Sequence, residues 1–215
     1  MSDTWFAWLT ILGRLAKWFL LWVAAWFVVG VIIGIAAYAE PLAARQYRNE
    51  LTREARAVWG LTAPVATMAG QIEQESGWRP DVCSPYACGL TQFTPATATW
   101  ISGLYSNLAM TDVFNPSWAI RALVRYDHLL HRGFENTATE RDRWAFTLSS
   151  YNGGAGNLRR EIRLCSARVI CNPTKWANVS AINSRALWAF RENRGYVNTI
   201  LDRRQFTYSH WGPTV

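Results

Sequence analysis

The sequence lacks any sustained alternation of apolar and polar residues, the pattern that marks a half-buried strand. It also lacks internal repeats and low-complexity tracts across its 215 residues. The first absence predicts little sheet, and the second indicates that the chain after its N-terminal region forms one unit. We therefore expect a mainly α-helical body.

Charge is absent from a long N-terminal stretch, since no charged residue occurs between Trp18 and Ala39. At ~1.5 Å per residue this run covers about 33 Å as a helix, enough to cross a hydrocarbon core of roughly 30 Å. A cleaved signal peptide is the alternative, because Ala37-Tyr38-Ala39 fits a cleavage site, but the run exceeds the ~7–15 apolar residues of such a peptide. We expect a short segment, residues 1–17, and then an uncleaved transmembrane helix in the lipid bilayer, residues 18–39.

Two glycines of this span, Gly30 and Gly34, match the small-xxx-small pattern that lets two helices approach closely. A homodimer through Gly30 and Gly34 is one interpretation of the pattern. The ordinary abundance of glycine in membrane spans is the other.

Only four cysteines occur, with Cys83 close to Cys88 and Cys165 close to Cys171. An even count at local spacing suits disulfides formed outside the cytoplasm, although four cysteines allow three connectivities. A zinc site needs tighter spacing and a nearby histidine, and neither is present. More basic residues follow the span than precede it, and by the positive-inside rule this would place the body in the cytoplasm. That rule weakens when a long domain follows the span. We expect a single-pass inner-membrane protein with its body in the periplasm or otherwise outside the cytoplasm.

The formal net charge of +7 favours a negatively charged partner, and nucleic acid, anionic lipid and bacterial cell wall all qualify. The basic residues are scattered and no interleaving of aromatic and basic residues stands out. We therefore expect no nucleic-acid partner.

Capping signals predict where several helices begin. They are Thr94-Pro95, Asn115-Pro116, Thr139 with Asp142, and Thr62 followed by Pro64. Further helices are expected over residues 41–59, 184–192 and 196–204, and loops over 76–95 and 152–174. Residues 40–59 then form a helical connector and residues 60–215 the main domain.

The most informative carboxylate is Glu75, near the end of a predicted helix that Ser76-Gly77 closes. If Ala69 and Ile72 face the core, Glu73 and Glu75 point about 200° apart and cannot share one task. A carboxylic acid in a partly apolar cleft can have its pKa raised towards ~6 and act as a general acid. The alternative is a solvated glutamate paired with a nearby arginine, and this stretch alone favours that alternative.

Three further stretches carry residues suited to sugar binding. "GLTQF" contains Gln92, whose amide can both donate to and accept from an N-acetyl group. "SSYNGGAG" places Tyr151 and Asn152 before glycines that let a ligand approach the backbone, and "GYVNTIL" contains Tyr196. Taken singly, each could instead be a turn, a helix cap or a core tyrosine.

In this order and spacing, the four stretches resemble the soluble lytic transglycosylase (SLT) domain of the lysozyme-like superfamily, over residues 60 to 205. The motifs are the Glu-Ser pair, Gly-Leu-x-Gln with its Pro-Ala-Thr-Ala tail at 95–98, Asn115-Pro116 with Tyr126, Tyr-Asn-Gly-Gly at 151–154 and Tyr196-Val197. Thr91 stands where the family commonly has methionine, and Gly153 where it commonly has alanine.

The resemblance implies a lysozyme-like (goose-type or SLT) helical domain that cleaves peptidoglycan between N-acetylmuramic acid and N-acetylglucosamine. Glu75 would protonate the glycosidic oxygen and then take a proton from the C6 hydroxyl, closing a 1,6-anhydro ring without a second carboxylate. Ser76, Gln92, Tyr151, Asn152 and Tyr196 would bind substrate or hold Glu75. No metal and no cofactor is implied.

Two rival functions stay open. A hydrolytic muramidase on the same fold would need an aspartate across the cleft, and Asp81, Asp112 and Asp127 are the candidates. A tethered wall-binding component of a larger phage or secretion assembly is the second rival. The sequence does not distinguish service to a phage, to a secretion system or to remodelling of the bacterium's own wall.

Overall fold

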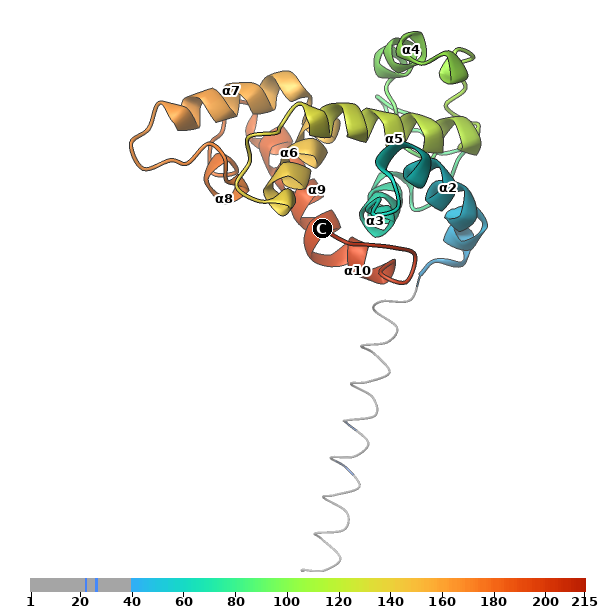
Figure 1. The fold of residues 1–215 in the computed structure, drawn as a ribbon. Helices are drawn as coiled ribbons and strands as arrows, with labels where there is room; N and C mark the ends of the chain where they lie inside the picture. Colours follow the sequence, from blue (N-terminus) through green and yellow to red (C-terminus); the bar gives the residue numbers. More distant parts are fainter. Residues whose placement is uncertain (1–21, 23–25, 27–39) are drawn as a thin grey trace, which may run out of the picture. The chain divides into compact units, whose positions relative to one another are not determined.

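The structure, a computed structural model, describes Trp22, Trp26 and residues 40–215 (Figure 1). The chain divides into two units, residues 1–39 and 40–215. In the first unit, the two described tryptophans are helical and exposed, and the predicted span and Gly30 and Gly34 lie outside the described residues. No helix within the described part of the chain has the length and apolar character needed to cross a membrane.

The second unit is built from helices, as the sequence predicts. In order they are η1 (Leu42–Tyr47), α2 (Arg48–Trp59), α3 (Val65–Ser76), α4 (Pro95–Leu104), η2 (Ser106–Leu108), α5 (Pro116–Arg132), α6 (Glu140–Gly153), α7 (Ala155–Ser166), α8 (Trp176–Val179), α9 (Leu187–Thr199), the π-helical η3 (Ile200–Arg204) and α10 (Gln205–Thr207). Between residues 40 and 215 the β-structure consists of isolated bridges near Cys88.

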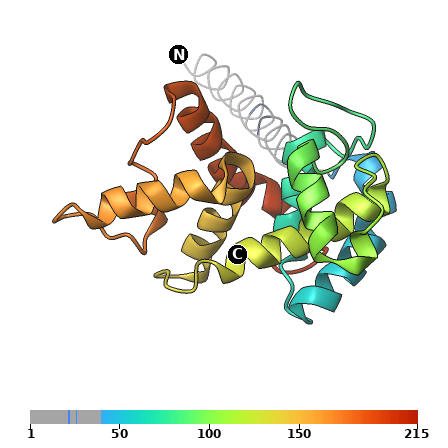
Figure 2. The same cartoon turned by 90° about the horizontal axis from the view of Figure 1, so that it is seen from above.

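Helix α5 packs against α2, α4 and α6 and so connects the two ends of this unit. In both views α2, α3 and α4 gather toward one end, and α7 and α8 lie at the other (Figures 1 and 2). The predicted connector belongs to the same core, because Leu51 and Ala55 are fully buried in it and the Trp59 indole donates a hydrogen bond to the Val124 carbonyl.

Helix α3 is the central element, and every residue from Val65 to Ile72 is buried. The C-terminal segment holds it on one side. The Thr67 hydroxyl donates to Oε1 of Gln205, and a Cβ at Gly70 would lie 2.9 Å from the Gln205 nitrogen. This close approach packs the first half of α3 against η3 and α10, which continue the chain from α9.

Three predicted helix starts are confirmed. The side chains of Thr94, Asn115 and Thr139 each accept a hydrogen bond from a backbone N–H in the first turn of their helices. The expected cap at Thr62 is wrong, because α3 begins at Val65 with Pro64 at its N-cap and no side-chain cap.

Two other expectations are corrected. The stretch 152–174 is not a loop throughout, since it contains α7, whose residues Leu158, Glu161 and Cys165 are buried at helical spacing. The helices expected over 184–192 and 196–204 are instead one helical segment from Leu187, because Gly195 continues the helix without a break.

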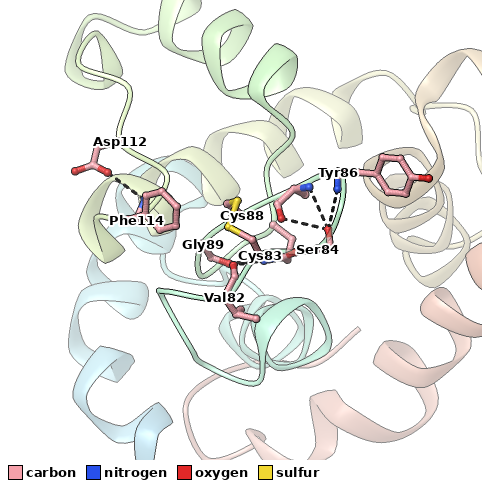
Figure 3. The surroundings of a disulfide bond; sticks show 10 residues. Val82, Cys83, Ser84, Tyr86, Cys88, Gly89, Asp112 and Phe114 are labelled. Carbon is pink, nitrogen blue, oxygen red and sulfur yellow. Dashed lines mark hydrogen bonds between the residues drawn. A yellow bond between two sulfur atoms is a disulfide. The ribbon is translucent and has the colours of Figure 1, made fainter.

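Both disulfides expected from the cysteine spacing are present. Cys83 is joined to Cys88 in the loop between α3 and α4, and Cys165 is joined to Cys171 after α7. Each bond closes a short local loop, and Figure 3 shows the first of them. Three residues of that first loop, Ser84, Tyr86 and Ala87, line the pocket described next.

Candidate active site

A cavity of about 560 Å³ opens beside the C-terminal end of α3. It is lined by Glu75 from α3, Gln92 from the following loop, Tyr151 and Asn152 from α6, and Tyr196 from α9. The fold therefore brings five of the six residues singled out in the sequence to one pocket, although they come from segments up to 121 residues apart.

The position of Glu75 follows from the way α3 ends. Gly77 adopts a left-handed conformation (φ 60°) and its N–H donates to the Glu73 carbonyl, which ends the helix at Ser76. Trp78 is also left-handed (φ 66°), a strained conformation for a large side chain. Burial of its ring and a bond from its indole to the Tyr208 hydroxyl hold it there.

Glu75 is the pocket residue whose environment best suits a general acid. Burial raises the pKa of its carboxyl to about 8, against the opposing effect of a hydrogen bond from Tyr196 and with a further increase from the charge of Glu192. The side chain keeps partial contact with solvent through the pocket. The carboxyl is thus protonated at neutral pH and accessible to a ligand.

Asp127 of α5 is fully buried, and its pKa is raised well above the usual range, mainly by burial and also by the charge of Glu75. Its Oδ1 accepts a hydrogen bond from the Gln71 amide at 3.3 Å. Asp127 does not line the pocket. Among the three aspartates considered in the sequence, Asp81 and Asp112 are exposed and also lie outside the pocket lining.

Gln92 shapes the pocket as well as lining it. Its amide nitrogen donates to the carbonyls of Val82 and Gly89, both at 2.9 Å, which leaves its Oε1 as an acceptor for a ligand. Gly89 has φ 83°, and a Cβ there would meet the Val113 carbonyl oxygen at 1.8 Å, so only glycine fits this turn.

Ser76 is placed differently from the other five. Its side chain is buried, and its hydroxyl donates to the Leu90 carbonyl at 2.7 Å. It does not line the pocket. Its hydrogen bond ties the end of α3 to the loop that carries Gln92.

The opposite wall is held by hydrogen bonds to main chain and side chain. The Tyr151 hydroxyl donates to the Thr91 carbonyl at 2.8 Å, and its ring packs against Phe93 and Tyr126. The Asn152 Oδ1 accepts a bond from the Asn193 amide, whose position is fixed by α9. These contacts fix the orientation of the Tyr151 ring in the pocket wall.

Several lining residues escaped the sequence analysis, chiefly Glu192, Arg185 and Tyr86. Glu192 could have been found, because it precedes Tyr196 by four positions and therefore shares its helix face. Tyr86 is largely exposed and lies in the loop closed by Cys83–Cys88 (Figure 3). Across the described residues, no group of three His, Cys, Asp or Glu side chains is arranged to hold a metal ion.

Comparison with known proteins agrees with this geometry. Residues 56–170 match the model of the transglycosylase SLT domain family. A protein named membrane-bound lytic murein transglycosylase F from Histophilus somni strain 2336 is 33% identical over 122 residues, covering 56% of this chain and 22% of that protein. One of the same name from Pseudomonas putida strain W619 is 26% identical over 173 residues, covering 76% of this chain and 33% of that protein.

The chain therefore spans a third or less of the length of these relatives. Among solved structures, the 70 kDa soluble lytic transglycosylase SLT70 from Escherichia coli matches with a TM-score of 0.58 at 23% identity. That match covers 78% of this chain and 25% of the other, and it shows the lysozyme-like fold. The chain belongs to the transglycosylase SLT domain family.

Proposed function

We propose that this protein is a peptidoglycan lytic transglycosylase that cleaves the β-1,4 bond between N-acetylmuramic acid and N-acetylglucosamine. The observation that carries the proposal is Glu75, a pocket carboxyl whose pKa is raised to about 8. A general acid works best when its pKa lies near the operating pH, and this one holds its proton at neutral pH.

In the proposed reaction, Glu75 donates its proton to the glycosidic oxygen and the bond from that oxygen to C1 of the muramic acid breaks. The C6 hydroxyl oxygen of the same sugar bonds to C1, and its proton passes to the Glu75 carboxylate. The products are a glycan end with a free hydroxyl and a 1,6-anhydro end. Atoms and charge balance without water, so the site needs no second carboxylate to activate a water molecule.

The other pocket residues suit a saccharide. Tyr151 contributes an aromatic ring to the pocket wall, while the Gln92 Oε1 and the Asn152 side chain offer polar atoms for hydroxyl and acetamido groups. Tyr196 holds the Glu75 carboxyl, and Ser76 holds the loop that carries Gln92. We assign substrate binding to the first three and positioning to the last two.

Hydrolysis on the same fold is the second candidate, and one observation favours it. Glu192 lines the pocket close enough for its charge to raise the pKa of Glu75, so a second carboxylate is present after all. If Glu192 activated water, the product would be a reducing end instead of an anhydro end.

The anchor and location also belong to the proposal. The uncharged run over 18–39 supports a single-pass helix in the inner membrane, and two formed disulfides support a body outside the cytoplasm. The two relatives described above carry "membrane-bound" in their names.

A homodimer through Gly30 and Gly34 is also part of the proposal. It is tested by crosslinking in lipid, with Gly30→Ile as the disrupting variant.

Mass spectrometry of purified peptidoglycan digested by the full chain tests the chemistry. The proposal expects 1,6-anhydromuramyl ends, which are lighter by one water than the reducing ends of a hydrolase. If only reducing ends were found, the protein would be a hydrolytic muramidase and the transglycosylase proposal would be wrong. Wall binding without any released fragment would favour the binding component.

A further inference from the structure

Arg185 lies in the wall of the same pocket as Glu75, although it precedes α9 and belongs to none of the motifs singled out in the sequence. Its side chain is only 6% exposed. The guanidinium forms a bidentate ion pair with the fully buried Glu161, in which Nε donates to Oε1 at 2.9 Å and Nη2 donates to Oε2 at 3.0 Å. This fork fixes the orientation of the guanidinium plane.

The remaining nitrogen of Arg185, Nη1, faces Gly153. A Cβ built on Gly153 would lie 2.1 Å from Nη1, so the guanidinium occupies the space that any side chain at 153 would take. Nη1 makes no hydrogen bond to any residue that the structure describes, and it is not among the fully enclosed polar atoms without a partner. A charged donor of fixed direction is therefore free beside Gly153, which lines the same pocket.

The charge balance around Glu161 leaves one positive charge over. Glu161 pairs with both Arg185 and Arg194. Arg194 uses its remaining donors internally, on Oδ1 of Asn193 and on the carbonyls of residues 179, 180 and 182. Of these two arginines only Arg185 lines the pocket, and it is the one basic side chain among the described residues of that lining. Glu192 supplies a carboxylate to the same lining, whereas Glu75, with a pKa of about 8, adds no further negative charge at neutral pH.

We propose that Arg185 is a specificity-determining residue that binds a carboxylate of the substrate through Nη1. This inference rests on the proposed function, which makes the substrate a peptidoglycan strand. Two carboxylates of such a strand qualify: the lactyl group of a muramic acid that has lost its peptide, and the acidic groups of an attached peptide. Guanidinium is suited to both because its hydrogen bonds to carboxylate are charge-assisted and directional.

Binding to the Glu75→Gln protein tests the assignment without any turnover. Three fragments of equal sugar length are titrated by calorimetry: a muramyl fragment with its peptide, the same fragment without the peptide, and a chitooligosaccharide with no carboxylate. We expect at least one muramyl fragment to bind ~10–100-fold more tightly than the chitooligosaccharide. Preference that survives removal of the peptide assigns the lactyl group, and preference that disappears assigns the peptide.

Two variants on the Glu75→Gln background then examine Arg185 itself. Arg185→Gln should abolish the preference while leaving chitooligosaccharide affinity within about twofold. Gly153→Ala should abolish the preference as well, because the added methyl displaces Nη1, but the methyl would also lie 2.7 Å from the Asn193 amide that holds Asn152, so this variant is judged on the preference alone. Arg191→Gln, an exposed residue on α9 with the same loss of charge, should keep it.

Thermal unfolding checks that the variants fold. Equal weakening toward all three fragments, or no preference in the Glu75→Gln protein, would overturn the proposal and leave Arg185 a structural partner of Glu161. Failure of the proposed function is a separate result, seen as absence of anhydro ends from the unmodified protein.

Discussion

The Tyr196 hydroxyl donates a hydrogen bond to Oε1 of Glu75, and this contact joins α9 to the last turn of α3. Oε2, which does not take part in this bond, is then available to carry the proton. Tyr196 is itself buried, so the bond restricts the rotamers of Glu75 without filling the pocket. A proton donor of fixed direction is what protonation of a glycosidic oxygen requires.

Replacing Glu75 by Gln should lower kcat/KM on peptidoglycan by at least ~10²–10⁴ with the fold retained, because the amide can accept from Tyr196 but cannot donate an acidic proton. Glu73→Gln is the matched control, since Glu73 lies two residues away, pairs with Arg204 and does not line the pocket. Release of soluble fragments measures both. Similar losses in the two variants would show that helix α3, and not the carboxyl at 75, is what matters.

The pKa of Glu75 predicts the alkaline limb of the pH profile. The donor must start protonated, so ionisation of Glu75 should leave kcat/KM unchanged below pH 7. Above about pH 8, kcat/KM should fall about tenfold per pH unit. Initial rates from pH 5 to 10 test this. A fall centred near 4.5, the ordinary value for glutamic acid, would contradict it.

Two neighbours should move that limb in opposite directions. The hydrogen bond from Tyr196 lowers the pKa of Glu75, so Tyr196→Phe should shift the limb to higher pH. The charge of Glu192 raises the same pKa, so Glu192→Gln should shift the limb to lower pH. The pH profiles of both variants, run beside the unmodified protein, measure the shifts, and shifts in the same direction would refute this account. If Glu192→Gln abolishes the reaction altogether, the hydrolytic mechanism gains support.

Glu75 should also make the protein less stable as the pH rises. Between pH 4.5 and about 8 the unfolded chain loses this proton while the folded protein keeps it, so the free energy of unfolding falls through that window. Glu75→Gln removes the penalty. The variant should match the unmodified protein at pH 4 and exceed it by about 1–3 kcal/mol at pH 8, measured by denaturant unfolding. An equal difference at both pH values would mean that packing, and not ionisation, is responsible.

Helix starts were predictable where their signal is local. The caps at Thr94, Asn115 and Thr139 bond backbone N–H groups two or three residues further on, so a short stretch of sequence contains the whole interaction. Glycine is also a local signal, but it gave wrong helix boundaries here. Gly154 with φ 81° separates α6 from α7 but does not prevent α7, and Gly195 lies inside α9. Whether a glycine breaks a helix depends on tertiary packing that sequence alone does not specify.

The candidate site shows the same division. Glu75, Gln92, Tyr151, Asn152 and Tyr196 were found through motifs, and the structure gathers them at one pocket. Arg185 was missed because its place depends on Glu161, a partner 24 residues earlier on another helix. No local pattern records such a pairing.

The disulfide Cys83–Cys88 gives the last prediction, because its loop carries Ser84 and Tyr86 at the pocket (Figure 3). The loop is flanked by Val82 and Gly89, whose carbonyls both accept hydrogen bonds from the Gln92 amide. Replacing both cysteines by alanine should remove roughly 2 kcal/mol of stability, the loop-closure contribution of so short a loop, and raise KM several-fold as the pocket rim loosens. The pair Cys165 and Cys171 closes a loop of nearly equal length away from the pocket lining. Its double alanine variant should lose comparable stability with KM unchanged, as judged by denaturant unfolding and initial rates. Equal changes in KM for the two variants would show that the first disulfide stabilises the fold without shaping the site.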